Sequence, residues 1–166
     1  MHEHEVEFDI SFGVITVSTS RFERHGSIKE PTKDDESGKY LVEEFNAKAY
    51  MLIPDNVIEI RRAVLDMLRE VDVVITTGGT GLNPKDVTIE AVKPLIEKEI
   101  EGFGEIFRFL SYQEIGDRAM LTRAFAGIVS GKAVFCLPGS LNAVKLGAKL
   151  IKSQVRHILT HARGLR

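Results

Sequence analysis

The chain has 166 residues, of which 43% are hydrophobic and 28% are charged. This length and composition are typical of one globular domain and exclude a chain that is disordered or membrane-embedded along its whole length. The formal net charge of −2 predicts no general attraction to nucleic acid or to an anionic membrane, so we expect neither as a partner.

The N-terminal residues and the cysteine content bear on the cellular compartment. Met1–Glu5 is polar and acidic, unlike a secretory signal peptide. Cys136 is the only cysteine, which excludes an intrachain disulfide and a cysteine zinc cluster. We therefore expect a cytoplasmic protein whose residues 1–166 form a single domain.

The first predicted strand covers residues 8–18, where β-branched and aromatic residues dominate. Residues 19–35 are polar and contain a glycine and a proline, so we interpret them as a long loop. Asp34 and Asp35 can then cap a helix from about 36 to 45.

A second strand is expected at 48–53, followed by a helix from about 56 to 69 whose apolar residues recur with helical spacing. Residues 71–76 are mostly apolar, with Asp72 near the start and no alternation after it, a pattern typical of a parallel strand that is buried on both faces. Thr88 can cap a short turn, and a proline in the first turn favours a helix over 94–99.

Glycines at 102 and 104 interrupt the pattern before a further predicted helix, from about 105 to 112. Residues 125–129 and 133–137 are typical of a hairpin, and a long amphipathic helix follows them. The alternation of strands and helices predicts an α/β fold with three layers. A mostly parallel central sheet would carry helices on both faces and a C-terminal antiparallel hairpin.

The strongest candidate for a binding site is the segment Thr76-Thr77-Gly78-Gly79-Thr80-Gly81, at the end of the buried strand. Its glycines permit positive φ and close approach to a ligand, its amides can bind an anion, and its threonines add hydroxyl donors. The spacing matches neither a dinucleotide fingerprint nor a P-loop. We predict that this loop binds a phosphorylated small molecule; the alternative is a simple tight turn.

Two carboxylates also follow strands of the predicted sheet. Asp55 comes after the second strand, and Asp86 comes after the glycine-rich loop. Either side chain could simply cap a helix. However, parallel strands end on the same edge of a sheet, and Mg²⁺ is held by one or two carboxylates together with substrate phosphates. The alternative to capping is therefore a metal–phosphate site formed by Asp55 and Asp86.

Further polar residues follow other strands or lie on the last helix. Pro138-Gly139-Ser140 precedes a helix whose N-terminus can receive an anion. Arg21 and Arg123 could each clamp a phosphate or be solvated at the surface. His157 and His161 lie four residues apart; because no acidic third ligand accompanies them, a partly exposed helix face is favoured over a metal pair.

Together these segments resemble the molybdopterin adenylyltransferase family, the MogA/MoaB group, which has a related domain in gephyrin. The matching segments run in order along most of the chain: Ser18–Arg21, Ser37-Gly38, Ile53-Pro54-Asp55, Thr76–Gly81, Asp86-Val87-Thr88, Ala119–Arg123 and Pro138-Gly139-Ser140. Thr122 stands where a serine is usual in the family, and it keeps the hydroxyl.

The resemblance implies a reaction and its participants. The terminal phosphate of molybdopterin attacks the α-phosphate of ATP in the presence of Mg²⁺, and adenylylated molybdopterin and pyrophosphate result. Asp55 and Asp86 would handle Mg²⁺ and the ATP phosphates. Substrate and nucleotide would be bound by Ser18, Ser37, Thr76, Thr77, Gly78, Gly79, Thr80, Gly81, Thr122, Pro138, Gly139 and Ser140. Family members form trimers or hexamers and pass their product to a molybdotransferase.

Three alternatives to this interpretation exist. A molybdopterin-binding protein without catalysis is disfavoured because both Asp55 and Asp86 are present. A molybdotransferase carries additional domains, for which this chain has no room. A flavodoxin-like or response-regulator-like module is disfavoured by the placement of the glycine loop.

Overall fold

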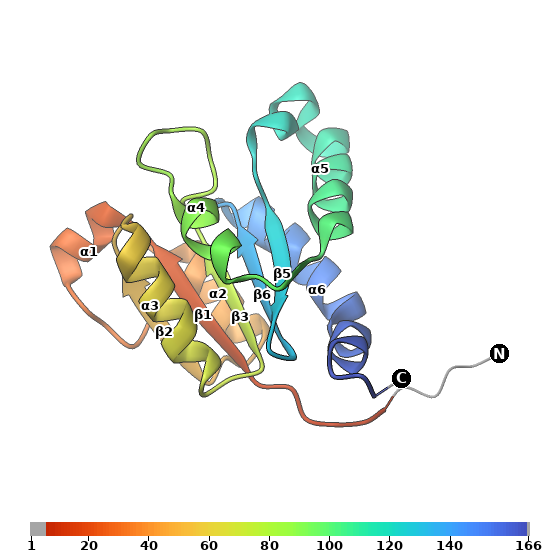
Figure 1. Ribbon diagram of the computed structural model, residues 1–166. Helices are drawn as coiled ribbons and strands as arrows, with labels where there is room; N and C mark the ends of the chain where they lie inside the picture. The colour runs from red at the N-terminus through yellow and green to blue at the C-terminus, as the bar shows by residue number, and fades with distance from the viewer. Residues whose placement is uncertain (1–5, 166) are drawn as a thin grey trace.

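The computed structural model describes residues 6–165, so Met1–Glu5 lies outside the described residues. Within them, six strands form one sheet in the order β2-β1-β3-β6-β5-β4 (Figure 1). The strands are β1 (Phe12–Val17), β2 (Ala49–Ile53), β3 (Val73–Thr77), β4 (Lys98–Glu99), β5 (Phe125–Val129) and β6 (Lys132–Leu137). β2, β1, β3 and β6 are parallel, whereas β5 is antiparallel to both β6 and β4. The predicted mostly parallel sheet and its hairpin are therefore confirmed.

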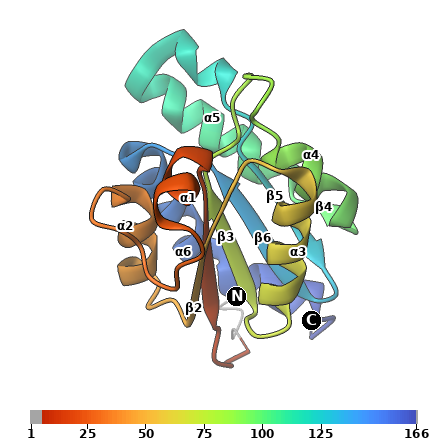
Figure 2. The same cartoon turned by 90° about the vertical axis from the view of Figure 1, so that its left-hand side faces the viewer.

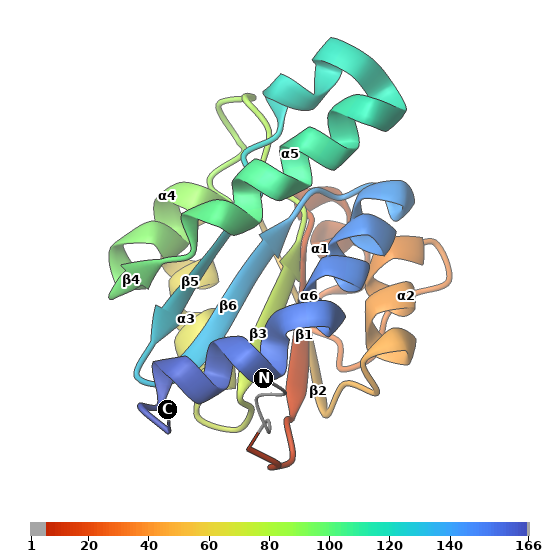
Figure 3. The same ribbon diagram turned by 90° about the vertical axis from the view of Figure 1, so that its right-hand side faces the viewer.

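Helices cover both faces of the sheet. They are α1 (Thr19–His25), α2 (Glu36–Glu44), α3 (Val57–Leu68), α4 (Thr88–Val92), α5 (Glu101–Ile115) and α6 (Leu141–Ala162), with short 3-10 helices η1 (Lys93–Leu95) and η2 (Gly116–Leu121). α2, α5 and α6 contribute to one apolar cluster, and α3 and α4 contribute to the other (Figures 2 and 3). The three-layer prediction is therefore confirmed. None of the helices in residues 6–165 combines the length and apolarity that a membrane span needs.

β3 lies at the centre of the core. All five of its residues are buried, as expected for a parallel strand covered on both faces. Val73 and Ile75 pack into the cluster that contains α6, whereas Val74 packs into the cluster that contains α3. The glycine loop therefore begins at the buried centre of the sheet.

The prediction of a loop over residues 19–35 is wrong for its first part, where α1 forms. The Ser18 side chain accepts a hydrogen bond from the amide of Arg21 and so caps the helix. Gly26 ends it with φ of 65°, and the Gly26 amide donates to the Phe22 carbonyl. Seven residues are too few to show an apolar period, so the polar composition concealed the helix.

The prediction of a helix over 94–99 is also wrong. α4 ends before Pro94, a single 3-10 turn follows, and Lys98 and Glu99 pair with β5 as β4. Gly127 on β5 explains the extended backbone, because a Cβ atom there would lie only 2.4 Å from the Ile96 side chain. The missing side chain at Gly127 thus leaves room for Ile96 to lie across β5.

Helix α5 begins earlier than predicted and contains both glycines that were expected to precede it. At Gly104 a Cβ atom would lie 2.7 Å from the Ala124 carbonyl oxygen. Gly104 therefore permits close packing of α5 against the segment that leads into β5, and it does not interrupt the helix. The far end of α5 and η2 project as an arm beyond the sheet, beside the connection between β3 and α4 (Figure 1).

Candidate active site

The glycine loop follows β3 at the carboxyl end of the parallel strands. Gly78 and Gly79 have φ of 102° and 73°, values that side chains disfavour. A Cβ atom on Gly78 would lie 2.4 Å from the carbonyl oxygen of Val17, and one on Gly79 would lie 2.2 Å from Oγ1 of Thr88. Both positions therefore require glycine, for conformation and for space.

The carbonyl oxygens of the loop are all occupied by donors from the protein itself. Thr88 donates from its hydroxyl to Gly78 (2.9 Å) and from its amide to Gly79 (3.1 Å). Arg123 donates from its amide to Thr80 (3.2 Å) and from Nη2 to Gly81 (2.8 Å). Thr88 therefore anchors the loop. It is the first residue of α4 and not its N-cap as predicted; Val87 takes the N-cap position, and its side chain forms no capping hydrogen bond.

Three of the four amides from Gly78 to Gly81 have no such partner within residues 6–165. The Gly78 amide donates to the carbonyl of Leu137 at the end of β6. In the described part of the chain, the amides of Gly79, Thr80 and Gly81 donate to no other group. The loop therefore offers a ligand donors without competing acceptors, which is the arrangement that binds an anion.

Asp55 reaches this loop from β2, although β1 lies between β2 and β3 in the sheet. Its Oδ2 atom accepts hydrogen bonds from the amide (3.1 Å) and the hydroxyl (2.7 Å) of Thr19. Its Oδ1 atom lies 3.3 Å from the place that a Cβ atom of Gly79 would take. Asp55 does not cap α3, because Asn56 performs that role by accepting from the amides of Ile58 and Glu59.

Asp86 lies on the other side of the loop. Its Oδ2 atom accepts a hydrogen bond from the amide of Asn83 at 3.2 Å, and it lies 2.7 Å from the place that a Cβ atom of Gly81 would take. It caps neither end of α4. The two carboxylates therefore flank consecutive parts of the loop, Asp55 at Gly79 and Asp86 at Gly81.

Neither arginine that was considered as a phosphate clamp is free. Besides holding Thr80 and Gly81, Arg123 donates from Nη2 to the carbonyl of Asp86 (3.1 Å) and pairs with Glu90. Its planar guanidinium thus ties the two ends of the 80–86 segment together. Arg21 donates to the carbonyl of Asp34 and forms an ion pair with its carboxylate.

Two adjoining cavities open next to the loop. The larger has a volume of about 360 Å³ and the smaller about 120 Å³, and both are lined by Ile115, Arg118, Thr122 and Pro138. Of the predicted residues, the larger is also lined by Gly78, Gly79, Thr80, Gly81, Asp86 and Gly139. Ser140 lines the smaller, while its side chain caps α6 by accepting from the Ala143 amide. The structure therefore gathers most of the predicted residues around one cleft.

Several predicted residues do not line this cleft. Thr76 and Thr77 are 0% and 2% exposed, and the Thr77 hydroxyl donates to the carbonyl of Pro138. Their hydroxyls are therefore enclosed in the protein and do not supply the ligand donors that were expected of them. Ser18 caps α1, as described above. Ser37 is buried and donates to the carbonyl of Gly139 at 2.8 Å, so it supports the turn from behind.

A buried carboxylate positions Ser37. Asp35 is 1% exposed and caps α2 by accepting from the amide of Gly38, which confirms the predicted capping role. Its other oxygen accepts from Thr16 and Tyr50, both at 2.8 Å. Burial raises the pKa of Tyr50, so this phenol remains a hydrogen-bond donor at neutral pH. The start of α2 is thereby fixed against the sheet.

Arg118 is the cleft residue that sequence reasoning missed. It is exposed on η2 and lines both cavities. In the described residues it forms no ion pair, so its guanidinium is available to an anionic ligand. Beside it, the buried hydroxyl of Thr122 has no hydrogen-bond partner within residues 6–165. No periodicity or motif distinguishes Arg118 in the sequence, because it reaches the cleft only through the position of η2 beside the glycine loop.

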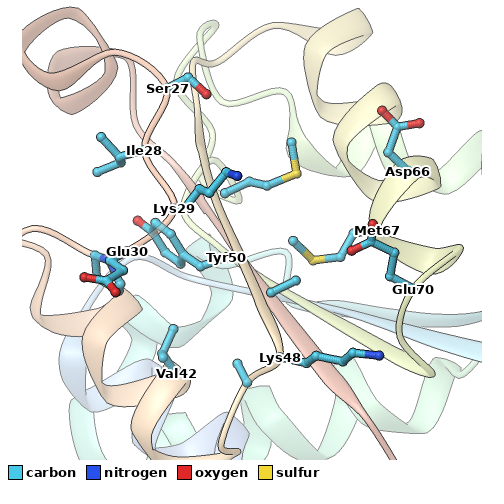
Figure 4. A pocket seen from close by; sticks show the side chains of 14 residues that line it. Ser27, Ile28, Lys29, Glu30, Val42, Lys48, Tyr50, Asp66, Met67 and Glu70 are labelled. Carbon is cyan, nitrogen blue, oxygen red and sulfur yellow. The ribbon is translucent and has the colours of Figure 1, made fainter.

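A cavity of about 670 Å³ lies elsewhere, beside edge strand β2 (Figure 4). Tyr50 and Met67 contribute apolar surface, and its charged residues include Lys29, Glu30 and Glu70. It contains none of the predicted site residues. Despite its size, it lacks the glycine loop and both aspartates, whereas the smaller cleft is lined by the loop and Asp86, with Asp55 behind Gly79. The chemistry therefore points to the smaller cleft.

Comparisons with known proteins identify the family of this chain. Residues 13–157 match the model of a probable molybdopterin binding domain. This chain belongs to the molybdopterin-binding domain family. It is 48% identical to a probable molybdopterin adenylyltransferase from Methanocaldococcus jannaschii, over 93% of this chain and 95% of that protein. It is 46% identical to the molybdopterin adenylyltransferase of Pyrococcus furiosus, over 98% and 96% of the two chains.

The fold of this molybdopterin-binding domain also matches solved structures. The crystal structure of the tungsten cofactor synthesizing protein MoaB from Pyrococcus furiosus superposes with a TM-score of 0.84 at 44% identity, covering 95% of this chain and 99% of that one. A molybdenum cofactor biosynthesis protein B superposes with a TM-score of 0.82 at 38% identity, over 97% and 99% of the two chains. The resemblance that was based on short motifs is therefore confirmed.

Proposed function

We propose that this protein is a Mg²⁺-dependent molybdopterin adenylyltransferase of molybdenum cofactor biosynthesis. The terminal phosphate oxygen of molybdopterin attacks the α-phosphorus of ATP. A new P–O bond forms, the bond between the α-phosphorus and the bridging oxygen to the β-phosphate breaks, and pyrophosphate leaves. The observation that carries this proposal is a loop of free amides flanked by Asp55 and Asp86.

The two aspartates suit Mg²⁺ that is shared with a nucleotide. No group of three or more histidine, cysteine, aspartate or glutamate residues that could hold a metal occurs in residues 6–165. The two carboxylates of Asp55 and Asp86 fit Mg²⁺, which commonly uses one or two carboxylates and completes its coordination shell with water and substrate phosphates. Asp55 and Asp86 would hold the ion, and its charge would neutralise the phosphate oxygens.

The protein groups mainly position the two substrates. The amides of Gly79, Thr80 and Gly81 would bind phosphate oxygens, since their carbonyls are turned to Thr88 and Arg123. The second cavity would take molybdopterin, where Arg118, Thr122 and Ser140 offer a cation and two hydroxyls. Holding a phosphate oxygen close to the α-phosphorus accounts for much of the rate enhancement in transfers of this kind.

The setting of the reaction belongs to the same proposal. The enzyme would work in the cytoplasm, as a homotrimer or homohexamer, and would hand adenylylated molybdopterin to a molybdotransferase. The expected mass in sedimentation equilibrium is three or six times the 18.5 kDa of the chain. A monomer at micromolar concentration would contradict this part alone.

Incubation with molybdopterin, ATP and Mg²⁺ tests the reaction, with adenylylated molybdopterin and pyrophosphate as the two readouts. Wild-type protein should form both, and Asp86→Asn should form neither while retaining its circular dichroism spectrum. Asp66→Asn, on the exposed side of α3, is the matched control and should remain active. If wild-type protein bound molybdopterin without releasing pyrophosphate, the non-catalytic binding protein would be the correct reading.

A further inference from the structure

The C-terminal turns of α6 bring two imidazole rings together. His157 and His161 are four residues apart, and their Nε2 atoms lie 3.1 Å from each other at the helix surface. The ring centroids are 4.5 Å apart and the planes are inclined by 69°. In the described residues, neither ring forms a hydrogen bond or an ion pair with any other side chain.

This separation is the one that two nitrogen ligands of a single metal ion adopt. Imidazole nitrogens bind zinc at about 2.0–2.1 Å, so two such ligands at angles between about 90° and 110° are about 2.9–3.4 Å apart. The sequence disfavoured a metal pair because no acidic third ligand accompanies the two histidines. The structure likewise has no cluster of three or more such ligands in residues 6–165. What the sequence did not show is that the two Nε2 atoms face one another.

We propose that His157 and His161 form a two-histidine site for a divalent transition-metal cation of the Zn²⁺, Cu²⁺ or Ni²⁺ class. Imidazole favours these ions, whereas Mg²⁺ requires oxygen ligands. Two protein ligands leave the remaining coordination positions to water. The bound ion therefore exchanges readily and bridges the last turns of α6.

The site is separate from the adenylyl-transfer cleft. His157 lies 16 residues after Leu141, the first residue of α6, which corresponds to about 24 Å along the helix axis. Ser140, before Leu141, lines the cleft, and the C-terminal end of α6 lies at the opposite end of the sheet from the glycine loop (Figure 3). Metal binding at the histidines is therefore independent of the metal that the aspartates would hold.

Isothermal titration of the chelator-treated full chain with Zn²⁺ tests the proposal. One ion per chain should bind to the wild type, and His157→Ala and His161→Ala should each weaken binding by about tenfold or more. Cu²⁺ supplies a spectroscopic readout: its electron paramagnetic resonance spectrum should show coupling to two nitrogens in the wild type and lose that pattern in both variants. Both histidines lie on the helix surface, so circular dichroism should be unchanged.

Other histidines provide the controls. His25→Ala removes a histidine from α1, and the double variant His2→Ala/His4→Ala removes both histidines from the N-terminal residues. Zn²⁺ binding should be unchanged in both. Binding that persists in the double variant His157→Ala/His161→Ala, or no binding by the wild type at millimolar Zn²⁺, would overturn the proposal and leave a metal-independent hydrogen bond between the rings.

Discussion

The Asp55 carboxylate approaches Gly79 at the carboxyl ends of the strands: Oδ1 of Asp55 lies 3.3 Å from the position that a Cβ atom of Gly79 would occupy. The carboxylate approaches the loop backbone at a residue that has no side chain. The other carboxylate oxygen is held by Thr19. Asp55 follows β2, and Thr19 begins α1. Together with the missing side chain at Gly79, they fix the direction in which Oδ1 of Asp55 points.

Replacing Gly79 by alanine should damage both the fold and the site. The φ of 73° disfavours any side chain, and the new Cβ atom would lie 2.2 Å from Oγ1 of Thr88. We expect a loss of about 2 kcal/mol or more in the free energy of unfolding, together with loss of ATP binding. Urea denaturation and calorimetric titration measure the two effects. Gly102→Ala is the control; it has open space around it within α5 and should be neutral or slightly stabilising.

Asp55→Asn should separate the effect of the negative charge on turnover from the effect of the side chain on stability. Asparagine retains an oxygen that can accept from Thr19, so the free energy of unfolding should fall by only about 1 kcal/mol. Loss of the charge should lower turnover by about 100-fold or more, measured as pyrophosphate release. The neighbouring Asn56→Ala removes the cap of α3 and should show the converse: a stability loss of about 1 kcal/mol with turnover retained. Near-normal turnover in Asp55→Asn would remove the metal role from Asp55.

Arg123→Lys should loosen the glycine loop without removing the positive charge. An ammonium group cannot reproduce the fork that bonds Thr80, Gly81 and the carbonyl of Asp86. We expect ATP to bind about tenfold more weakly, because each lost hydrogen bond to a charged group is worth about 1.5 kcal/mol or more. Arg62→Lys on exposed α3 is the control and should bind ATP normally. Unchanged ATP affinity in Arg123→Lys would show that the loop holds its shape without the fork.

Arg118→Ala tests the proposed contact between Arg118 and molybdopterin. Its guanidinium is exposed and unpaired in the described residues, so the free energy of unfolding should change by no more than about 0.5 kcal/mol. The KM for molybdopterin should rise about tenfold, because a charged hydrogen bond is lost, and the KM for ATP should rise less, although Arg118 also lines the cavity beside the glycine loop. A rise in the KM for ATP alone would assign Arg118 to the nucleotide.

Asp72 should make stability depend on acid pH. Burial alone would raise the pKa of Asp72, but hydrogen bonds from Ser11 and Arg163 outweigh it and lower the pKa below its ordinary value. The depressed folded-state pKa means that the contribution is present above the unfolded value of about 3.8 and disappears as pH falls through the folded value. Asp72→Asn should therefore cost about 2 kcal/mol at pH 7, with a smaller difference from wild type at pH below 3. Urea denaturation at a series of pH values measures it; an equal loss at every pH would assign the effect to packing.

The fold was largely predictable because its signals are local. The run of β-branched residues from Val73 to Thr77 predicts a doubly covered strand, and the glycines directly after it predict a ligand loop. Asp55 and Asp86 were predicted to lie together because parallel strands end on the same edge of a sheet, and the family resemblance then implied their role. Short elements were missed, because β4 exists only through its pairing with β5 and the space above Gly127.

The details of the site were less predictable because they depend on contacts between distant residues. Arg123 was considered as a ligand clamp, yet it bonds Thr80 from 43 positions away in the chain. Ser37 was assigned to substrate, yet its hydroxyl donates to Gly139 across 102 positions. A residue type indicates which bonds a side chain can form, whereas only the fold determines which partner is within reach.

The occupied carbonyls of the glycine loop have a thermodynamic consequence. Because Thr88 and Arg123 already restrain the backbone from Gly78 to Gly81, a ligand that binds there gives up its own freedom and little of the protein's. A loop of three glycines would otherwise lose more conformational entropy on ordering than almost any other segment of equal length. If the loop binds phosphate as proposed, its affinity would thus be set largely during folding, before a nucleotide arrives.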